Sequence, residues 1–426
     1  MFLLALAVLT ASPELTVSRF NSWPPCPTPA TLGWRKGLDG TMHDLTVQKL
    51  STEDELKELE CEWNHLLGLR PRWLPFETPE WHAAWWSHLP EHKPWVTDEL
   101  SSFAIRSRTG ELVGVAPMMS TKRPGLGPLA VTALDFIGPD PNLTELRGVV
   151  SHPELETEVH HALRQHLHEV SGWHWIHWRG LRVGSATEKV LSALPGVQAQ
   201  VELRNYVIHL PATWEELRAS RPRNLKESLR KCYNSLKRDG HAFTFEVATT
   251  REAVSSALGR FFALHNARSQ LSDTTSHIDV FAAESSRAFV IDVCRRLIAR
   301  GSTRVFELRI GGDVVASRVG FVQGDLLYLY YSGYDPKWAD YSVMTTTVAE
   351  AMKYAISQGL KQVNLSFGTD VSKTRWDPEL VVYKDLVEVA PALTRRYAYP
   401  AYQEARRVLD EKGLRKLLGH VLSRRA

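Results

Sequence analysis

The chain has 426 residues, with 51 Lys and Arg against 48 Asp and Glu, so its formal net charge is only +3. This balance excludes a strongly basic protein that coats nucleic acid, and it excludes an acidic, solvating tail. The length fits two or three domains, and a hydrophobic fraction of 43% is enough to bury their cores.

Residues 1–41 open the chain with a short apolar run and continue through a Pro-rich stretch without pattern. The run has no Lys or Arg before it and is too short to span a bilayer. We therefore expect residues 1–41 to be a disordered leader or a mis-assigned start, and the true start, Met1 or Met42, stays open. A genuine secretion or anchor signal is the alternative. No later segment has 18 consecutive apolar residues, so we expect no membrane span.

From residue 42 to about 200 the patterns predict an alternation of helices and strands. Ser51 and Thr52 precede three acidic residues, which is a typical helix start, and an apolar helical stripe follows. A second helix is expected over residues 81–89. The remaining patterns predict strands over 100–106, 112–119 and 131–137, a helix over 154–170 and a strand over 173–178.

The second half of the chain repeats this order of elements. Helical patterns cover residues 214–237, 251–269 and 281–300, and strand patterns cover 303–310, 314–322 and 326–332. A helix over 342–358, ended by Gly359, and a strand over 362–367 complete the series. We predict an α/β (α+β) protein with two similarly built domains, 42–200 and 201–390, and a basic C-terminal helix over 391–426.

The cysteines are scattered along the chain at Cys26, Cys61, Cys232 and Cys294. They form no C-x-x-C pair, and no His stands at zinc-finger spacing beside them. We therefore expect neither a disulfide framework nor a structural zinc site. Scattered single cysteines fit a reducing compartment, and we expect a cytoplasmic protein.

The start of the helix at Ser342 is the first candidate for chemistry. It follows a strand, over residues 326–332, and a loop. Helix N-termini present unpaired N–H groups and a partial positive charge, which suit phosphate. The hydroxyls of Thr345 and Thr346 add donors. Plain helix capping is the alternative.

The loop after the strand over 362–367 is the second candidate. It brings Asp370, Lys373 and Arg375 close together in sequence, at a strand end where α/β folds often place their sites. The two cations can stabilise a developing oxyanion or hold phosphate, and Asp370 can act as general base or orient them. A surface turn held by salt bridges is the alternative.

Two further patterns carry polar groups. Arg223, Lys226 and Arg230 form a basic stripe on a helix that begins near Pro222, which fits either bound phosphates or a solvated face. His174 and His177 stand in an aromatic strand without a carboxylate or Cys beside them. We expect that strand to be buried, and we expect no metal site.

The chain resembles the CelD/BcsL-type acetyltransferases of the GNAT superfamily. The residues that carry the resemblance are the Y-S-G-Y-D-P-x-W stretch from Tyr331, the loop over 364–376, the basic helix over 221–240 and the P-F-E-T-P-E-W stretch from Pro75. The group also resembles the Fem-type peptidoglycan-bridge transferases, which pair two GNAT-like domains. The resemblance covers about residues 42–390.

The resemblance implies two tandem GNAT-like domains with mixed, mainly antiparallel sheets, flanking helices and a cleft. It implies transfer of an acyl group, most simply acetyl, from acyl-CoA to an amine or hydroxyl of a sugar, exopolysaccharide or cell-envelope precursor. The thioester arm would lie between two splayed strands, 326–332 and 362–367. The implied donor-binding residues are Tyr328, Tyr330, Ser332, Ser342, Val343, Met344, Thr345 and Thr346.

We predict the remaining roles from the residues themselves, within this reading. Asp370 would be the base or orienting group, and Lys373 and Arg375 would stabilise charge. Lys373 also matches the basic residue of the Fem-type loop. The implied acceptor-binding residues are Arg223, Lys226, Arg230 and Tyr383.

Two alternative functions stay open. Fem-type relatives take their acyl group from aminoacyl-tRNA, and this chain lacks the usual Gly-rich turn before the helix at Ser342, which favours a non-catalytic binding protein. We expect a small-molecule or saccharide acceptor, no nucleic-acid partner and no metal. The basic C-terminus can touch a membrane surface, and the oligomeric state stays open.

Overall fold

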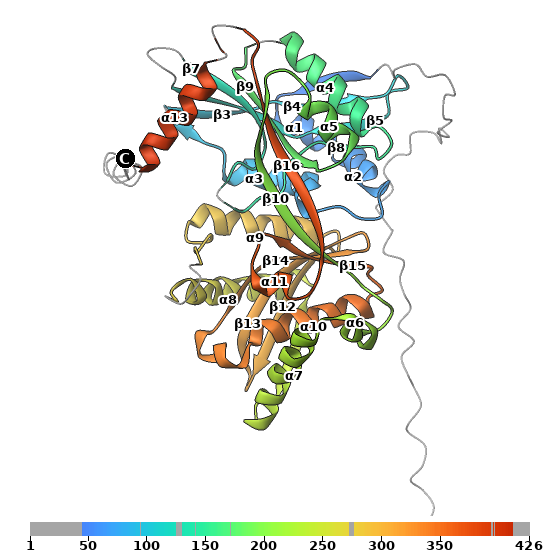
Figure 1. Cartoon of the computed structure of the whole chain (residues 1–426), viewed down its shortest axis with the longest axis vertical. Coiled ribbons are helices and arrows are strands. Elements are labelled where there is room, and N and C mark those ends of the chain that lie inside the picture. The colour runs from blue at the N-terminus through green and yellow to red at the C-terminus, as the bar shows by residue number, and fades with distance from the viewer. Residues whose placement is uncertain are drawn as a thin grey trace, which may run out of the picture. The chain divides into compact units, whose positions relative to one another are not determined.

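The computed structural model describes residues 45–411, except for 94, 125–129, 141, 171, 272–276, 393–394 and 396 (Figure 1). The predicted leader over residues 1–41 and the part of the basic C-terminus after residue 411 lie outside the described residues. Both therefore stay predictions.

The N-terminal half contains a mixture of short strands and helices. Its elements are β1 (Thr46–Leu50), α1 (Glu53–Glu58), α2 (Glu60–Gly68), η1 (Pro75–Glu77), α3 (Pro79–His88), β2 (His92–Lys93), β3 (Val96–Leu100), β4 (Ser102–Arg106), β5 (Leu112–Ala116), β6 (Met118–Pro124), β7 (Ala130–Phe136), β8 (Val150–Ser151), α4 (Glu156–Val170), β9 (Trp175–Arg182) and α5 (Ala186–Ser192). The first helix starts where the sequence predicts, because Thr52 and Glu55 form a reciprocal capping box.

The C-terminal half has longer strands and helices. Its elements are β10 (Val197–His209), α6 (Trp214–Ser220), α7 (Arg223–Arg238), β11 (Phe243–Ala248), α8 (Arg251–Ser269), α9 (Glu284–Ile298), β12 (Thr303–Ile310), β13 (Asp313–Gln323), β14 (Leu326–Tyr334), η2 (Pro336–Tyr341), α10 (Val343–Ser357), β15 (Gln362–Phe367), α11 (Val371–Thr374), β16 (Glu379–Val389) and α13 (Ala398–Glu411). The helix predicted to begin near Pro222 is confirmed as α7, and the residues before it form a separate helix, α6.

The described strands form a four-stranded sheet, ordered β1-β4-β5-β8, and a twelve-stranded sheet, ordered β11-β12-β13-β14-β15-β10-β16-β9-β7-β6-β3-β2. Most neighbours are antiparallel. Each half has one parallel pair, β7 with β9 and β14 with β15. The predicted mixed, mainly antiparallel α/β fold is therefore confirmed.

Two strands predicted as continuous are each divided between the two sheets. The run over 100–106 breaks at Ser101 into β3 and β4, and the run over 112–119 breaks at Pro117 into β5 and β6. Pro117 lacks an amide hydrogen and cannot donate to a ladder, so the chain changes sheets there. The alternation of apolar and polar residues in the sequence does not reveal that a strand passes from one sheet to another.

The long strands β10 and β16 run side by side from one half into the other (Figure 1). Residue 200, the predicted domain boundary, lies within β10. The described residues also fall in one compact unit. The boundary itself stays a prediction.

Strand β14 is buried on both faces. Tyr328 and Tyr330 belong to an apolar core that includes Trp81 of the N-terminal half and helices α8 and α9. Leu327 and Leu329 belong to a different core, beneath α10. Alternation along the strand thus places the phenols towards the N-terminal half and the leucines towards α10.

Cys232 and Cys294 are buried free thiols. Cys61 is disulfide-bonded, which departs from the expectation of unlinked cysteines. Spacing along the sequence could not reveal it, because pairing depends on which cysteines approach in the fold. Within the described part of the chain, no helix is long and apolar enough to cross a membrane.

Candidate functional site

The parallel strands β14 and β15 pair over a short stretch and then separate. Leu326 to Tyr328 lie opposite Gln362 to Asn364, and the ladder ends there. On its other edge β14 carries a bulge, because Tyr330 and Tyr331 both lie opposite Val319 of β13. Beyond Tyr328, the edge of β14 that faces β15 has no strand partner among the described residues.

The end of β15 turns away for a local reason. Ser366 has φ +68° and Gly368 has φ +94°, both in the left-handed region that ends a strand. The Asn364 side chain accepts a hydrogen bond from the Ser366 amide at 2.8 Å. The side-chain amides of Asn364 and Asn205, of β10, donate a hydrogen bond to each other. The opening between β14 and β15 is therefore built by β10 and by the turn itself.

A cluster of polar groups lies at this opening. Tyr328 donates its hydroxyl hydrogen to the Glu145 carboxylate, and Lys373 donates to the Phe367 carbonyl. The guanidinium of Arg318, from β13, donates to the carbonyls of Leu329 and Tyr330 at 3.2 Å each. Lys373 and Arg318 both act electrostatically on Glu145.

Burial favours the uncharged form of each of these groups and shifts its pKa accordingly. It raises the pKa of Glu145, lowers the pKa of Lys373, and lowers the pKa of Arg318 to about 10. Shifted pKa values of this kind are common among groups that carry acid–base chemistry, so the cluster is a candidate for it.

The side chains of Asp370, Lys373 and Arg375 have different partners and do not form one cluster. Asp370 caps the short helix α11 by accepting from the Ser372 amide at 2.9 Å, and its other oxygen lies 3.5 Å from the Lys373 ammonium. Arg375 points elsewhere: it donates to Ser228 of α7 and lies 3.5 Å from the Thr345 hydroxyl of α10. The predicted trio is thus divided between the opening and the start of α10.

The N-terminus of α10 has no side-chain cap. Ser342 adopts φ +52°, and the amides of Val343 and Met344 have no hydrogen-bond partner among the described residues. Their side chains pack into an apolar cluster with Leu236, so only their backbone is available. Two amides and the adjacent Arg375 guanidinium are the donor set that a pyrophosphate needs.

The tyrosines of β14 bind the N-terminal half. Tyr330 and Tyr331 donate to the carbonyls of Leu143 and Asn142, each at 2.5 Å. Together with Tyr328 they hold the segment that carries Glu145 against the strand. Ser332 lies on the side of α8, where its hydroxyl accepts from Arg268 at 3.2 Å. The tyrosine side chains thus position the segment of Glu145, and the backbone of β14 remains as the candidate donor-binding feature.

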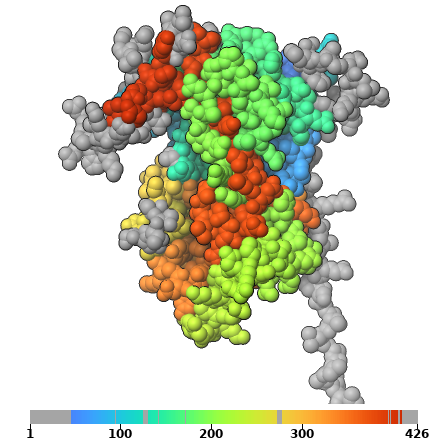
Figure 2. Space-filling view, in the orientation of Figure 1, coloured from blue at the N-terminus to red at the C-terminus, as the bar shows by residue number. Residues whose placement is uncertain are grey.

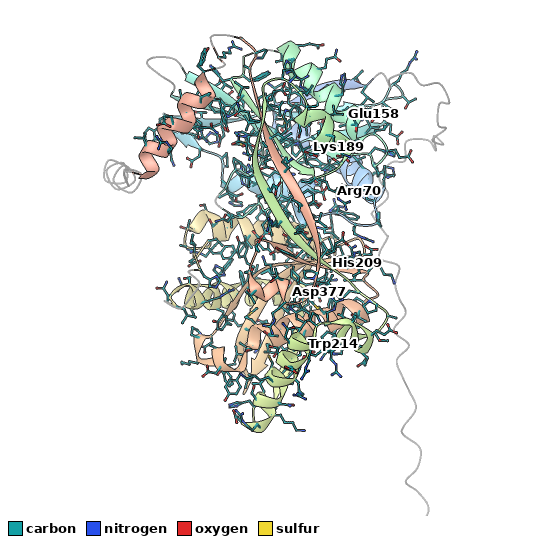
Figure 3. All side chains as sticks on the ribbon, viewed as in Figure 1. Arg70, Glu158, Lys189, His209, Trp214 and Asp377 are labelled. Carbon is teal, nitrogen blue, oxygen red and sulfur yellow. The ribbon has the colours of Figure 1, made fainter. Side chains whose placement is uncertain are left out.

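A cavity of about 530 Å³ lies beside the cluster, between the two halves. Its lining includes Arg70, Trp73, Arg147, Arg182, Asn364 and Tyr383. Figure 3 labels two of the residues that line it, Arg70 after α2 and His209 at the end of β10. Asn364 also pairs with Tyr328, so the cavity and the opening share a wall.

Of the predicted acceptor-binding residues, Tyr383 lines this cavity, and the basic stripe does not. Arg223 is exposed and pairs with Glu227 at 2.8 Å, Lys226 donates to the Ala219 carbonyl, and Arg230 is exposed. These residues belong to α7, which lies at the far end of the C-terminal half in Figure 1. Figure 2 shows the orange-red surface of α11 and β16 between that helix and the N-terminal half.

Glu145 and Arg318 were not predicted. Arg318 carried a signal, because it is the one charge inside the apolar run over 314–322. Glu145 carried none, since it stands in a loop and meets Tyr328 across 183 residues. Among the described residues, no group of His, Cys, Asp and Glu could hold a metal ion.

Comparison with known proteins gave one family model and several solved structures. Residues 223–384 match the model described as the acetyltransferase (GNAT) domain. The crystal structure of FemX is 13% identical, covers 84% of this chain and 99% of its own, and superposes with a TM-score of 0.56. That likeness shows the fold alone. No curated protein matches the chain.

Two further solved structures were found. A tandem GNAT protein from the clavulanic acid biosynthesis pathway is 12% identical, covers 82% of this chain and 100% of its own, and has a TM-score of 0.44. The C-terminal domain of a putative lysylphosphatidylglycerol synthetase from Agrobacterium fabrum is 11% identical, covers 84% and 97%, and has a TM-score of 0.45.

Proposed function

Because residues 223–384 match the acetyltransferase (GNAT) domain, we propose that the protein transfers an acyl group from acyl-CoA to an acceptor amine or hydroxyl. The family implies an acyl-CoA co-substrate. One observation carries the proposal: the segment after β15 places Lys373 at the end of β15 and Arg375 beside Thr345, at the uncapped start of α10. The proposed acyl group is acetyl, and the proposed acceptor is a small molecule or saccharide.

The donor side uses the backbone and one arginine. The amides of Val343 and Met344, with Arg375 beside them, suit the pyrophosphate of CoA. The unpaired edge of β14 beyond Tyr328 suits the pantetheine arm, which would otherwise leave its amides without partners. Backbone N–H groups on that edge are placed to stabilise negative charge on the carbonyl oxygen.

The acceptor side uses the cavity and Glu145. The acceptor nitrogen or oxygen attacks the thioester carbonyl carbon, and the bond from that carbon to sulfur breaks. Glu145 takes the proton that the acceptor releases and can return it, through the Tyr328 hydroxyl, to the departing sulfur. This arrangement favours Glu145 over Asp370 as the base, since Asp370 is engaged in capping α11.

Lys373 contributes positive charge at the same place. Its ammonium is held by the Phe367 carbonyl and by Asp370, so it points into the opening. A fixed cation there can offset the charge that develops on the carbonyl oxygen. In this proposal Asp370 orients Lys373, and Arg375 serves the donor phosphates.

Calorimetric titration of the full chain with acetyl-CoA tests the donor assignment. We expect micromolar binding, and we expect Thr345→Glu to abolish it by placing a carboxylate at the start of α10. Thr244→Glu, on the exposed face of the edge strand β11, is the matched control and should bind normally. Absence of binding at millimolar acetyl-CoA would overturn the proposal in favour of an aminoacyl-tRNA donor or a non-catalytic binding protein.

A further inference from the structure

The cavity between the halves is rich in arginine, but its arginines are not equally satisfied. Arg72 forms two hydrogen bonds with Asp325, at 2.7 and 3.0 Å. Arg179 bonds both Asp135 and Asp385. These guanidinium groups are neutralised within the protein and have a structural role.

Arg70 is only partly satisfied. One of its terminal nitrogens donates to Glu77 at 2.9 Å. Its Nε and its other terminal nitrogen are buried and have no hydrogen-bond partner among the described residues. Buried N–H groups without partners are costly, so donors left in this state beside a cavity indicate a ligand that accepts from them.

Arg182 stands at the end of β9, directly opposite Tyr383 of β16 in the antiparallel register. No carboxylate among the described residues forms an ion pair with it. Tyr383 links the two arginines: burial and Glu77 raise the pKa of its phenol to about 12, while the charges of Arg182 and Arg70 oppose that rise. Arg182 is paired with Tyr383 across the two strands, and Arg70, Arg182 and Tyr383 all line the cavity.

We propose that Arg70, Arg182 and Tyr383 form a cradle for a phosphate group of the acceptor, which makes the acceptor a phosphorylated saccharide. Planar guanidinium groups bind phosphate oxygens through paired N–H donors, and the phenol adds a further donor. The cavity, of about 530 Å³, is much larger than one phosphate, and Trp73 supplies an aromatic wall for a sugar ring. The inference rests on the proposed function, because it takes the occupant to be the acyl acceptor.

Calorimetry with three probes tests the cradle: glucose 1-phosphate, glucuronate and glucose. Each titration is performed in the Thr345→Glu variant, so that phosphate cannot be taken up at the start of α10. We expect glucose 1-phosphate to bind at least about tenfold more tightly than glucose, because a good charge-assisted contact is worth about a factor of ten or more. Glucuronate separates a carboxylate acceptor from a phosphate acceptor.

Arg182→Gln is the decisive variant, because Arg182 is exposed and its loss leaves no buried partner unpaired. We expect it to weaken glucose 1-phosphate binding about tenfold while acetyl-CoA binding to the otherwise native chain is unchanged. Arg108→Gln, in the exposed turn between β4 and β5, is the matched control and should leave both affinities unchanged.

Three outcomes would overturn the cradle: equal binding of glucose and glucose 1-phosphate, tighter binding of glucuronate, or no effect of Arg182→Gln. The donor assignment fails separately, through acetyl-CoA. If Arg182-dependent binding of glucose 1-phosphate is found in a protein that binds no acetyl-CoA, the cradle stands and the acyl-CoA proposal falls.

Discussion

At the scale of single residues, the site depends on a few polar side chains that burial has made unusual. Glu145, Arg318 and Lys373 come from separate parts of the chain and meet at one opening between strands. Each has a pKa that burial shifts toward its neutral form. Their chemistry is therefore a property of the fold rather than of any local motif.

Replacing the proposed base gives the first prediction. We expect Glu145→Gln to lower kcat by about 10²–10⁴, the usual contribution of a general base, with a smaller change in KM. Acetyl-transfer kinetics measure it. Glu252→Gln, an exposed carboxylate in the first turn of α8, should leave kcat unchanged.

The dependence of turnover on pH follows from the same group. A base must be deprotonated to act, and burial raises the pKa of Glu145. Turnover of the native enzyme should thus fall as the pH drops through a value above the ordinary glutamate range, and Glu145→Gln should lack this acidic limb. An acidic limb that persists in the variant would assign the base elsewhere.

At the scale of elements, short turns set the positions of the reactive groups. The strand β15 ends in a left-handed turn at Ser366, and α11 follows under the cap of Asp370. This connection aims Lys373 into the opening. Arg375, from the same loop, lies beside Thr345 at the uncapped N-terminus of α10, so one loop and one helix end define the proposed donor site.

The role of Asp370 distinguishes capping from catalysis. Asn caps helices about as well as Asp, whereas Ala does not, at a cost of about 0.5–2 kcal/mol. We expect Asp370→Asn to keep turnover within a few-fold of that of the native enzyme. We expect Asp370→Ala and Lys373→Ala, each made alone, to lower turnover. Steady-state kinetics decide the point, and a loss of about 10² or more in Asp370→Asn would restore Asp370 as the base.

At the scale of the whole molecule, the two halves contribute residues to a common apolar core and strands to one twelve-stranded sheet. Trp81 of α3 is fully buried, donates to the Thr144 hydroxyl at 3.1 Å, and meets Phe289 of α9 and Tyr330 of β14 edge to face. The N-terminal half therefore supports the strand that carries the proposed donor site.

Truncation of the Trp81 side chain should destabilise both halves together. We expect Trp81→Ala to lower the free energy of unfolding by about 3–5 kcal/mol, as is typical for a buried aromatic residue. Urea unfolding followed by circular dichroism should show a single transition that moves to lower urea. Trp95→Ala, at a side chain 42% exposed, should change it little. Two separate transitions would show that the halves unfold independently.

Sequence patterns alone recovered the fold class, most helices, the element order of the C-terminal half and the GNAT resemblance. The predictions of fold and elements succeed because hydrophobic periodicity and capping act between residues close in sequence. Lys373 and the start of α10 came from the same kind of local feature, a loop after a buried strand and a helix start, and their roles stay predictions.

Tertiary structure decided the rest. Contacts between distant segments decide three features: the change of sheet at Ser101 and Pro117, the separation of β14 from β15, and the hydrogen bond between Glu145 and Tyr328. The same holds for Arg70 and Arg182, which approach Tyr383 only when the two halves enclose a cavity. A charge in a loop looks solvated in a sequence, and only the fold shows that it is buried and which group it faces.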